Sequence, residues 1–535
     1  MHLLKFRKTG PAILFILGAL ILLLLLNAAM KNTFEFDPDE GTYLVIAKLS
    51  LQGFKLYSQI WNDQPPLFTE LLSSWFRIFG ASAYSGRFFN LIFSLFLLWG
   101  LYRIIKLRSG SSAALAAGIF LILSQGFLRL GISIMPGLPS LTLAVLSLYS
   151  ATIYSGSKSK PALFISSAFM AFALATKFSS IILAPSVFLE IGRAEEKTDR
   201  PFPARPKNFI LPFFWLISSL VFYICFMWPY FYLNLNLFAE QLFSPHLAKL
   251  NIPGADFNVI FAQLLLDYDL VLLGAVAVFT NLRSGARRNI LLPAVWLGLA
   301  ITCFVIHRPI WYHYYLLVSI PLCWLAAVAL GQFLERKNGK NPKRFLYYLS
   351  FALVVLAMAR IPFKFIDGCL ILKEPPIGEE KRILDLISKF KKDGQWMFTD
   401  LSIFAFSSNI LVPPETAVLT QKNPPTTKLA ASVLKKYKPE LILLGRFTDY
   451  DRQMISEIQK DYRKESEITI FRPGSFPVSS WLPIAVFLTP RIQYPVNKWL
   501  RRLNWQPKIL ITERIGFFYT QNLTLFIRKN NADQF

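Results

Sequence analysis

Long apolar segments dominate this sequence of 535 residues. A helix that crosses a membrane needs about 20 mostly apolar residues. Eleven candidate spans follow one another at residues 11–30, 86–105, 112–130, 137–154, 161–176, 178–192, 209–231, 258–280, 289–306, 311–333 and 344–362. Hydrophobic residues make up 54% of the chain and the mean hydropathy is +0.43, which excludes an ordinary water-soluble protein. The pattern therefore predicts an all-α polytopic membrane protein with about 11 transmembrane helices.

The formal net charge of +25 is typical of a nucleic-acid-binding protein when the protein is soluble. Here every second gap between the apolar segments is strongly basic, and the gaps between those are not. Loops rich in Lys and Arg face the cytoplasm. We therefore expect a cytoplasmic N-terminus, a first loop at 31–84 outside the cytoplasm, and no nucleic-acid partner.

The chain divides into two predicted domains, a multispan domain at residues 1–362 and a second domain at 363–535. Within the second domain, helical patterns alternate with short apolar segments typical of strands. The helices are predicted at 379–392, 427–437 and 449–463, and the strands at 395–400, 440–445, 467–471 and 523–529. This order predicts an extracytoplasmic α/β domain. The proline-rich residues 473–507 are left unassigned.

The first loop concentrates the scarce carboxylates of the multispan domain. Of fifteen acidic residues before position 363, six lie in this loop: Glu35, Asp37, Asp39, Glu40, Asp63 and Glu70. The simplest explanation of acidic residues on an external loop is solvation. Carboxylates next to a membrane are nevertheless costly unless they are used, and Pro65, Pro66 and Trp61 favour a packed structure over a loose linker. We therefore take this loop as the candidate site.

The loop also carries a pattern that resembles a known family. Its residues are Asp37, Asp39, Glu40, Tyr43, Ala47, Gly53, Leu56, Tyr57, Trp61, Pro65, Pro66, Leu67, Phe79, Gly80 and Arg87. This pattern is similar to the membrane glycosyltransferases of the GT-C fold, in the bacterial branch related to protein O-mannosyltransferases and lipid A aminoarabinose transferases. Weaker similarities lie at residues 175–177, 307–316 and Pro321.

The resemblance implies transfer of a sugar from a polyprenyl-phosphate donor to an acceptor lipid, glycan or protein outside the cytoplasm, with inversion at the anomeric carbon. It also implies a place in the bacterial inner membrane and a role in the cell envelope. Asp39 is the implied general base. The implied substrate-binding residues are Asp37, Glu40, Tyr57, Arg87, Lys177, Arg308, His313 and Tyr315. No cofactor is implied, although Asp37 and Asp39 have the oxygen ligands that a divalent cation prefers.

Other interpretations remain open. The basic residues are also explained by side chains that reach toward the membrane surface, and the aromatic ones by an interfacial belt. The chain departs from the family pattern, with Gln64 where aminoarabinose transferases have Lys, and Gly137 and Leu138 where relatives often have Asp. A transporter or flippase of lipid-linked sugars, or a catalytically inactive envelope protein, is the alternative.

Overall fold

The computed structural model describes residues 18, 20–124, 126–194, 209–243, 257–335, 344–372, 378–391, 394–420, 423–447, 450, 452–473 and 518–529. The helices are a segment at Leu20–Asn32, then α2 (Glu40–Leu51), α3 (Leu67–Phe79), α4 (Ala83–Ile122), α5 (Phe127–Leu130), α6 (Gly137–Ser157), α7 (Lys160–Thr176), α8 (Ala184–Ala194), α9 (Ile210–Leu242), α11 (Phe257–Leu266), α12 (Tyr268–Ser284), α13 (Leu291–Ile306), α14 (Leu316–Glu335), α15 (Arg344–Leu372), α16 (Gly378–Phe390), α17 (Ser402–Ser407), α18 (Thr427–Tyr437) and α19 (Arg452–Asp461). Short 3-10 helices are η1 (Phe178–Leu183), η3 (Arg287–Asn289), η4 (Tyr312–Tyr315) and η6 (Pro414–Thr416). The strands are β1 (Met397–Thr399), β2 (Leu441–Leu444), β3 (Tyr462–Pro473) and β4 (Phe518–Arg528).

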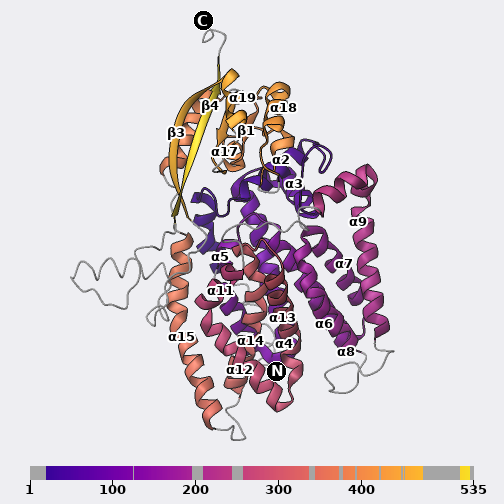
Figure 1. Ribbon diagram of the computed structural model, residues 1–535. Helices are drawn as coiled ribbons and strands as arrows, with labels where there is room; N and C mark the ends of the chain where they lie inside the picture. The colour runs from indigo at the N-terminus through magenta and orange to yellow at the C-terminus, as the bar shows by residue number, and fades with distance from the viewer. Residues whose placement is uncertain are drawn as a thin grey trace, which may run out of the picture.

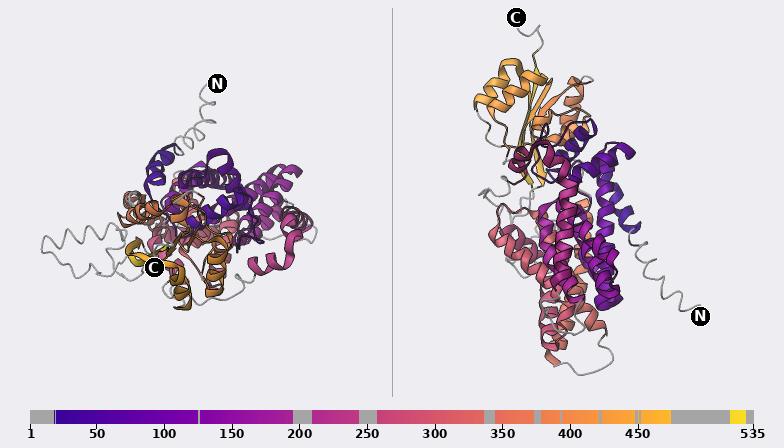
Figure 2. Two further views of the ribbon diagram at one scale, coloured as in Figure 1. Left: turned by 90° about the horizontal axis from the view of Figure 1, so that it is seen from above. Right: turned by 90° about the vertical axis from the view of Figure 1, so that its right-hand side faces the viewer.

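The long helices form a bundle, and a small sheet lies at one end of it (Figures 1 and 2). Within the bundle, α4 packs against α6 and α14, α7 packs against α6 and α9, and α12 packs against α14. Small polar residues allow close approach between neighbouring helices. Ser147 on α6 and Ser166 on α7 each donate a hydrogen bond to the other's backbone carbonyl, at 2.7 and 2.9 Å.

Five of the described helices are long and apolar enough to cross a membrane, or six if one bent pair forms a single span. They lie at Ala83–Ile122, Gly137–Ser157, Ile210–Tyr232, Tyr312–Leu334 and Tyr348–Ile366, and the bent pair is Val259–Leu266 with Tyr268–Ser284. Shorter apolar helices occupy Leu20–Asn32, Lys160–Thr176 and Leu291–Ile306. The chain is thus a multi-pass membrane protein, while the predicted number of eleven spans stays a prediction.

Two breaks in the helices lie at boundaries that the sequence predicts, and a third divides a predicted span. Residues 86–105 and 112–130 are predicted as two helices, and α4 is indeed divided between them by non-helical backbone at Gly110, where φ is 84°, before it ends at Ile122. Lys177 has an extended backbone and separates α7 from η1. The chain also breaks at Asp267, between α11 and α12, which meet at 83°.

The sheet has the strand order β1-β2-β4-β3. β1 and β2 are parallel, whereas β4 is antiparallel to both of its neighbours. Because side chains alternate across a strand, Phe398 and Ile442 pack into a core with α18 and α19. Met397 and Leu441 belong to the larger core on the other side. The predicted strands at 395–400, 440–445, 467–471 and 523–529 overlap β1, β2, β3 and β4.

The sheet contacts the first loop through α17, which packs on α2. A Cβ atom added at Gly41 would lie 2.2 Å from the backbone nitrogen of Ile403, so only glycine permits this approach. Phe404 packs against Phe34 with ring centroids 4.8 Å apart, and Lys48 donates a 2.6 Å hydrogen bond to Asn409. The first loop and the sheet therefore lie at the same end of the bundle (Figure 1).

The predicted boundary between the two domains stays a prediction. Helix α15 continues past residue 362 as far as Leu372, so the last apolar segment is longer than the sequence pattern suggested. The proline-rich residues 474–507 and the start of the predicted first span lie outside the described residues.

Candidate active site

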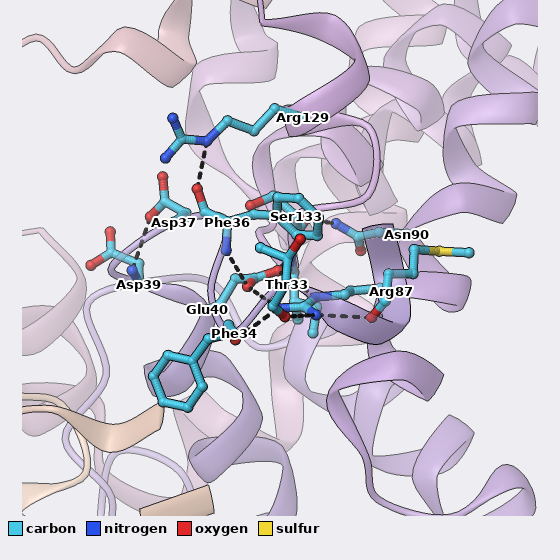
Figure 3. Close-up of polar contacts among 12 residues, drawn as sticks. Thr33, Phe34, Phe36, Asp37, Asp39, Glu40, Arg87, Asn90, Arg129 and Ser133 are labelled. Atoms are coloured by element: carbon cyan, nitrogen blue, oxygen red, sulfur yellow. Dashed lines mark hydrogen bonds and ion pairs between the residues drawn. The ribbon is translucent and has the colours of Figure 1, made fainter. Parts of the chain in front are cut away.

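Asp37 and Asp39 lie side by side in the turn that leads into α2 (Figure 3). The backbone N–H of Asp39 donates a 2.9 Å hydrogen bond to Oδ1 of Asp37, and the Tyr312 hydroxyl donates to the other oxygen of Asp37. Asp37 is buried, and each of its carboxylate oxygens accepts one of these hydrogen bonds. Burial and the neighbouring Asp39 raise the pKa of Asp37 to about 6, against the opposing effect of the Tyr312 hydrogen bond.

Arg129, in α5, holds this turn from the other side (Figure 3). Its Nε donates a 2.6 Å hydrogen bond to the carbonyl of Phe36, and its guanidinium lies 5.2 Å from the centre of the Tyr312 ring. The positive charge of Arg129 also lowers the pKa of Asp37, although less than burial raises it. Arg129 therefore positions the Asp37 turn and supplies positive charge next to it.

Asp39 is the more accessible of the two carboxylates, since 35% of its side chain is exposed. It lies at the N-cap of α2 but makes no capping bond with its side chain. Instead its Oδ1 accepts a 2.6 Å hydrogen bond from Nη2 of Arg446. Burial raises the pKa of Asp39, but the ion pair with Arg446 outweighs this, so the pKa lies below its ordinary value.

Arg446 comes from the turn that follows β2, at the carboxyl edge of the sheet. Asp400, directly after the parallel strand β1, accepts hydrogen bonds from the backbone N–H groups of Gly445, at 3.1 Å, and Arg446, at 3.0 Å. The Tyr450 hydroxyl also donates to Asp400, and it accepts the backbone N–H of Phe447 at 3.2 Å. This network fixes the backbone from which Arg446 reaches Asp39.

Two further predicted residues lie close enough to Asp39 to interact with it electrostatically, namely Lys177 and His313. Lys177 is buried at the end of α7, with its Nζ 4.8 Å above the ring of Tyr314. A Cβ added at Gly137 would lie 3.9 Å from this Nζ. The structure thus brings Asp37, Asp39, Lys177 and His313 together, while their roles stay predictions.

Glu40 and Arg87 belong to a different environment. Glu40 points away from Asp39 toward Arg87 (Figure 3), and the two form a 2.9 Å ion pair in which both side chains are buried. Arg87 also donates to the backbone carbonyls of Met30, Thr33 and Phe34. The charges of this pair stabilise the fold of the first loop, and its predicted substrate contacts stay predictions.

Tyr57 and Tyr315 also have structural contacts. Tyr57 donates a 2.7 Å hydrogen bond to the carbonyl of Gln64 and is buried. Tyr315 donates at 2.9 Å to Asp267, which is paired at 2.8 Å with Lys364. This second ionic cluster ties α15 to the break between α11 and α12, and the substrate contact of Tyr315 stays a prediction. Arg308 is exposed, outside the hydrogen-bonded group around Asp37.

The sequence analysis missed Arg129, Tyr312, Arg446 and Asp400. The sequence did carry a signal for Asp400 and Arg446. Asp400 directly follows β1, and Arg446 follows β2 after one glycine. Functional groups commonly lie at the carboxyl ends of parallel strands. Tyr312 stood within the aromatic segment 307–316 but was not singled out.

Comparison with known structures identifies the architecture. ArnT from Cupriavidus metallidurans, solved with bound undecaprenyl phosphate, matches with a TM-score of 0.58 and 15% identity over 82% of this chain and 93% of that chain. The chain has the GT-C fold. The archaeal oligosaccharyltransferase AglB from Archaeoglobus fulgidus, solved with an inhibitory peptide and a dolichol-phosphate, matches this GT-C chain with a TM-score of 0.55 and 12% identity, over 98% and 89% of the two chains.

The sequence itself carries a more local similarity. Residues 63–228 match the family model of dolichyl-phosphate-mannose-protein mannosyltransferases, a range that includes Pro65, Arg87 and Lys177 but begins after Asp39. No curated protein sequence matches the chain. The resemblance inferred from the first loop is confirmed at the level of the fold and of this family model.

No group of three or more His, Cys, Asp or Glu side chains among the described residues is arranged to hold a metal ion. Asp37 and Asp39 are neighbours, but their carboxylates have different partners, Tyr312 and Arg446 respectively. A divalent cation between them stays an untested alternative.

Proposed function

We propose that this chain is a glycosyltransferase that transfers a hexose or pentose from a polyprenyl-phosphate donor to an acceptor hydroxyl on the extracytoplasmic side of the bacterial inner membrane. The observation that carries the proposal is the placement of the carboxylates Asp37 and Asp39, with the cations Arg129, Lys177 and Arg446, at the junction of the helix bundle and the sheet. At this junction a lipid-linked sugar and a water-soluble acceptor can meet. ArnT and AglB, which share the fold, were solved with polyprenyl phosphates.

The reaction requires a base for the acceptor hydroxyl. Asp39 takes this role because its carboxylate is partly exposed, whereas both oxygens of Asp37 are occupied. The acceptor oxygen attacks the anomeric carbon and its proton passes to Asp39. The bond from that carbon to the phosphate oxygen breaks, the electron pair leaves with the lipid phosphate, and attack opposite the leaving group inverts the anomeric centre.

The departing phosphate needs positive charge that is already in place. Lys177 lies beside Asp39 at the end of a membrane helix, and its Nζ rests on the Tyr314 ring. His313 neighbours the same carboxylate. Lys177 is therefore assigned to the phosphate, and His313 to the sugar or to the acceptor.

Lipid and glycan extracts from cells that express the wild type and Asp39→Asn provide the test. Mass spectrometry should find a glycosylated product that the Asn variant, present at equal amounts in the membrane, does not form. Asp385→Asn, a change of an exposed carboxylate in α16, is the matched control and should keep the product. An intact product with Asp39→Asn would contradict the assignment of the base.

The same extracts distinguish the alternative function. A flippase changes the side of the membrane on which a lipid-linked sugar lies, but leaves the composition of the glycans unchanged. A product whose mass equals the acceptor plus one sugar residue supports transfer. Unchanged masses, with an altered distribution across the membrane, would support transport.

A further inference from the structure

Arg446 is the one described residue of the sheet region that forms an ion pair with Asp39. Its backbone is fixed by Asp400, which accepts hydrogen bonds from Gly445 and from Arg446 itself. Its side chain is less constrained, because 24% of it is exposed and, among the described residues, the guanidinium donates its hydrogen bond to Asp39. An arginine whose backbone is fixed and whose guanidinium is accessible can exchange one anionic partner for another.

We propose that Arg446 alternates between two partners: it holds Asp39 in the unliganded protein and passes to the phosphate of the polyprenyl donor when the donor binds. This exchange, which rests on the proposed function, leaves Asp39 open to the acceptor hydroxyl only once the donor is in place. Arg446 is thereby a binding residue for the lipid phosphate and also a control on the base.

The energetics favour such an exchange. An ion pair that water reaches contributes little, on the order of 0.2–1 kcal/mol, and the Asp39–Arg446 pair is partly exposed on both sides. A phosphate offers several oxygens to the planar guanidinium, which binds phosphate through two parallel hydrogen bonds. A phosphate can therefore compete for the arginine while the backbone of the turn stays in place.

The exchange also changes the chemistry of Asp39. The ion pair with Arg446 lowers the pKa of this carboxyl, which makes Asp39 a weak base as long as the pair persists. When the guanidinium leaves, its lowering effect is lost while burial and the charges of Lys177 and His313 remain, so the pKa of the carboxyl rises. A base that becomes stronger as the donor binds is active at the step that requires it.

A simpler role for Arg446 must be distinguished, in which it only attaches the sheet to the first loop and neutralises Asp39. The two roles differ in a protein that lacks the Asp39 charge. If Arg446 binds the phosphate, its removal weakens lipid binding even in the Asp39→Asn background. If it only neutralises Asp39, its removal in that background has no effect.

The test is the binding of undecaprenyl phosphate to the full-length protein in lipid nanodiscs, measured by quenching of tryptophan fluorescence. We expect Asp39→Asn to bind about two- to fivefold more tightly than the wild type, as the exposed ion pair is released. The double variant Asp39→Asn/Arg446→Gln should bind on the order of tenfold more weakly than Asp39→Asn, the loss expected for a charged hydrogen bond. Arg528→Gln in the same background is the matched control, because Arg528 pairs with Glu440 elsewhere in the sheet region.

The binding results distinguish a failure of the arginine exchange from a failure of the proposed glycosyl transfer. Equal affinities of Asp39→Asn and the double variant would overturn the exchange while leaving glycosyl transfer possible. If the wild type does not bind undecaprenyl phosphate at all, the proposed function fails and the exchange fails with it. Thermal unfolding of each variant checks its fold, and Arg446→Met, which keeps the apolar stem, replaces Arg446→Gln if that variant unfolds.

Discussion

The buried ion pair between Glu40 and Arg87 allows a quantitative test of how the first loop is held. Substituting Arg87 by Met keeps the apolar stem but removes the guanidinium, which leaves the Glu40 carboxylate without its cation in a site where 0% of its side chain is exposed. Breaking a buried pair from one side costs about 3–5 kcal/mol. Arg87 also donates to three backbone carbonyls, so we expect a value at the upper end of this range.

The measurement is denaturant-induced unfolding of detergent-solubilised protein, followed by tryptophan fluorescence. The double variant Glu40→Gln/Arg87→Met should lose less stability than the two single variants combined, because it leaves no buried charge alone. A loss below about 1 kcal/mol for Arg87→Met, the size of an exposed pair, would refute the structural role. An Arg87→Met protein that is normally stable but lacks transferase activity would support the predicted role of Arg87 in substrate binding.

Gly41→Ala should separate the sheet from the first loop and abolish transfer, because the added methyl group would collide with the Ile403 backbone. Faster proteolysis of the sheet region would report this separation. Gly118→Ala is the control and should behave as the wild type, because a Cβ atom at Gly118 has nothing within 4 Å. Asp37, with its pKa raised to about 6, is protonated below that pH and ionised above it, so transfer should increase as the pH rises through about 6. Tyr312→Phe removes a hydrogen bond that lowers this pKa and should move the acid limb of the rate profile to higher pH; identical profiles from pH 5 to 8 would contradict a role for ionised Asp37.

The fold was largely accessible from the sequence because apolar segments and strand patterns are local. The helices predicted at 427–437 and 449–463 are observed as α18 and α19, and the predicted strands overlap those of the sheet. One break was less accessible. The break at Asp267 divides one predicted span into α11 and α12, and an acidic residue inside an apolar segment does not by itself reveal such a change of direction.

The site was accessible only in part. The clustering of carboxylates in the first loop led to Asp37 and Asp39, yet the same reasoning grouped Glu40 with them. The helix turns Glu40 toward Arg87 instead, and this ion pair connects segments that the sequence keeps 47 residues apart. Arg446 was missed for the same reason, because its partner is fixed by the docking of the sheet and not by any local pattern.

The contact between Asp39 and Arg446 joins residues that are 407 positions apart, and this distance has a consequence for biosynthesis. A ribosome releases the first loop into the membrane long before it reaches the codon for the arginine. The growing polypeptide therefore carries Asp39 without its arginine partner until residue 446 has been synthesised. A premature stop codon between the helix bundle and residue 446 would leave an inserted protein in which Asp39 lacks its arginine partner. Exchanging the sheet between relatives would alter the reaction centre itself.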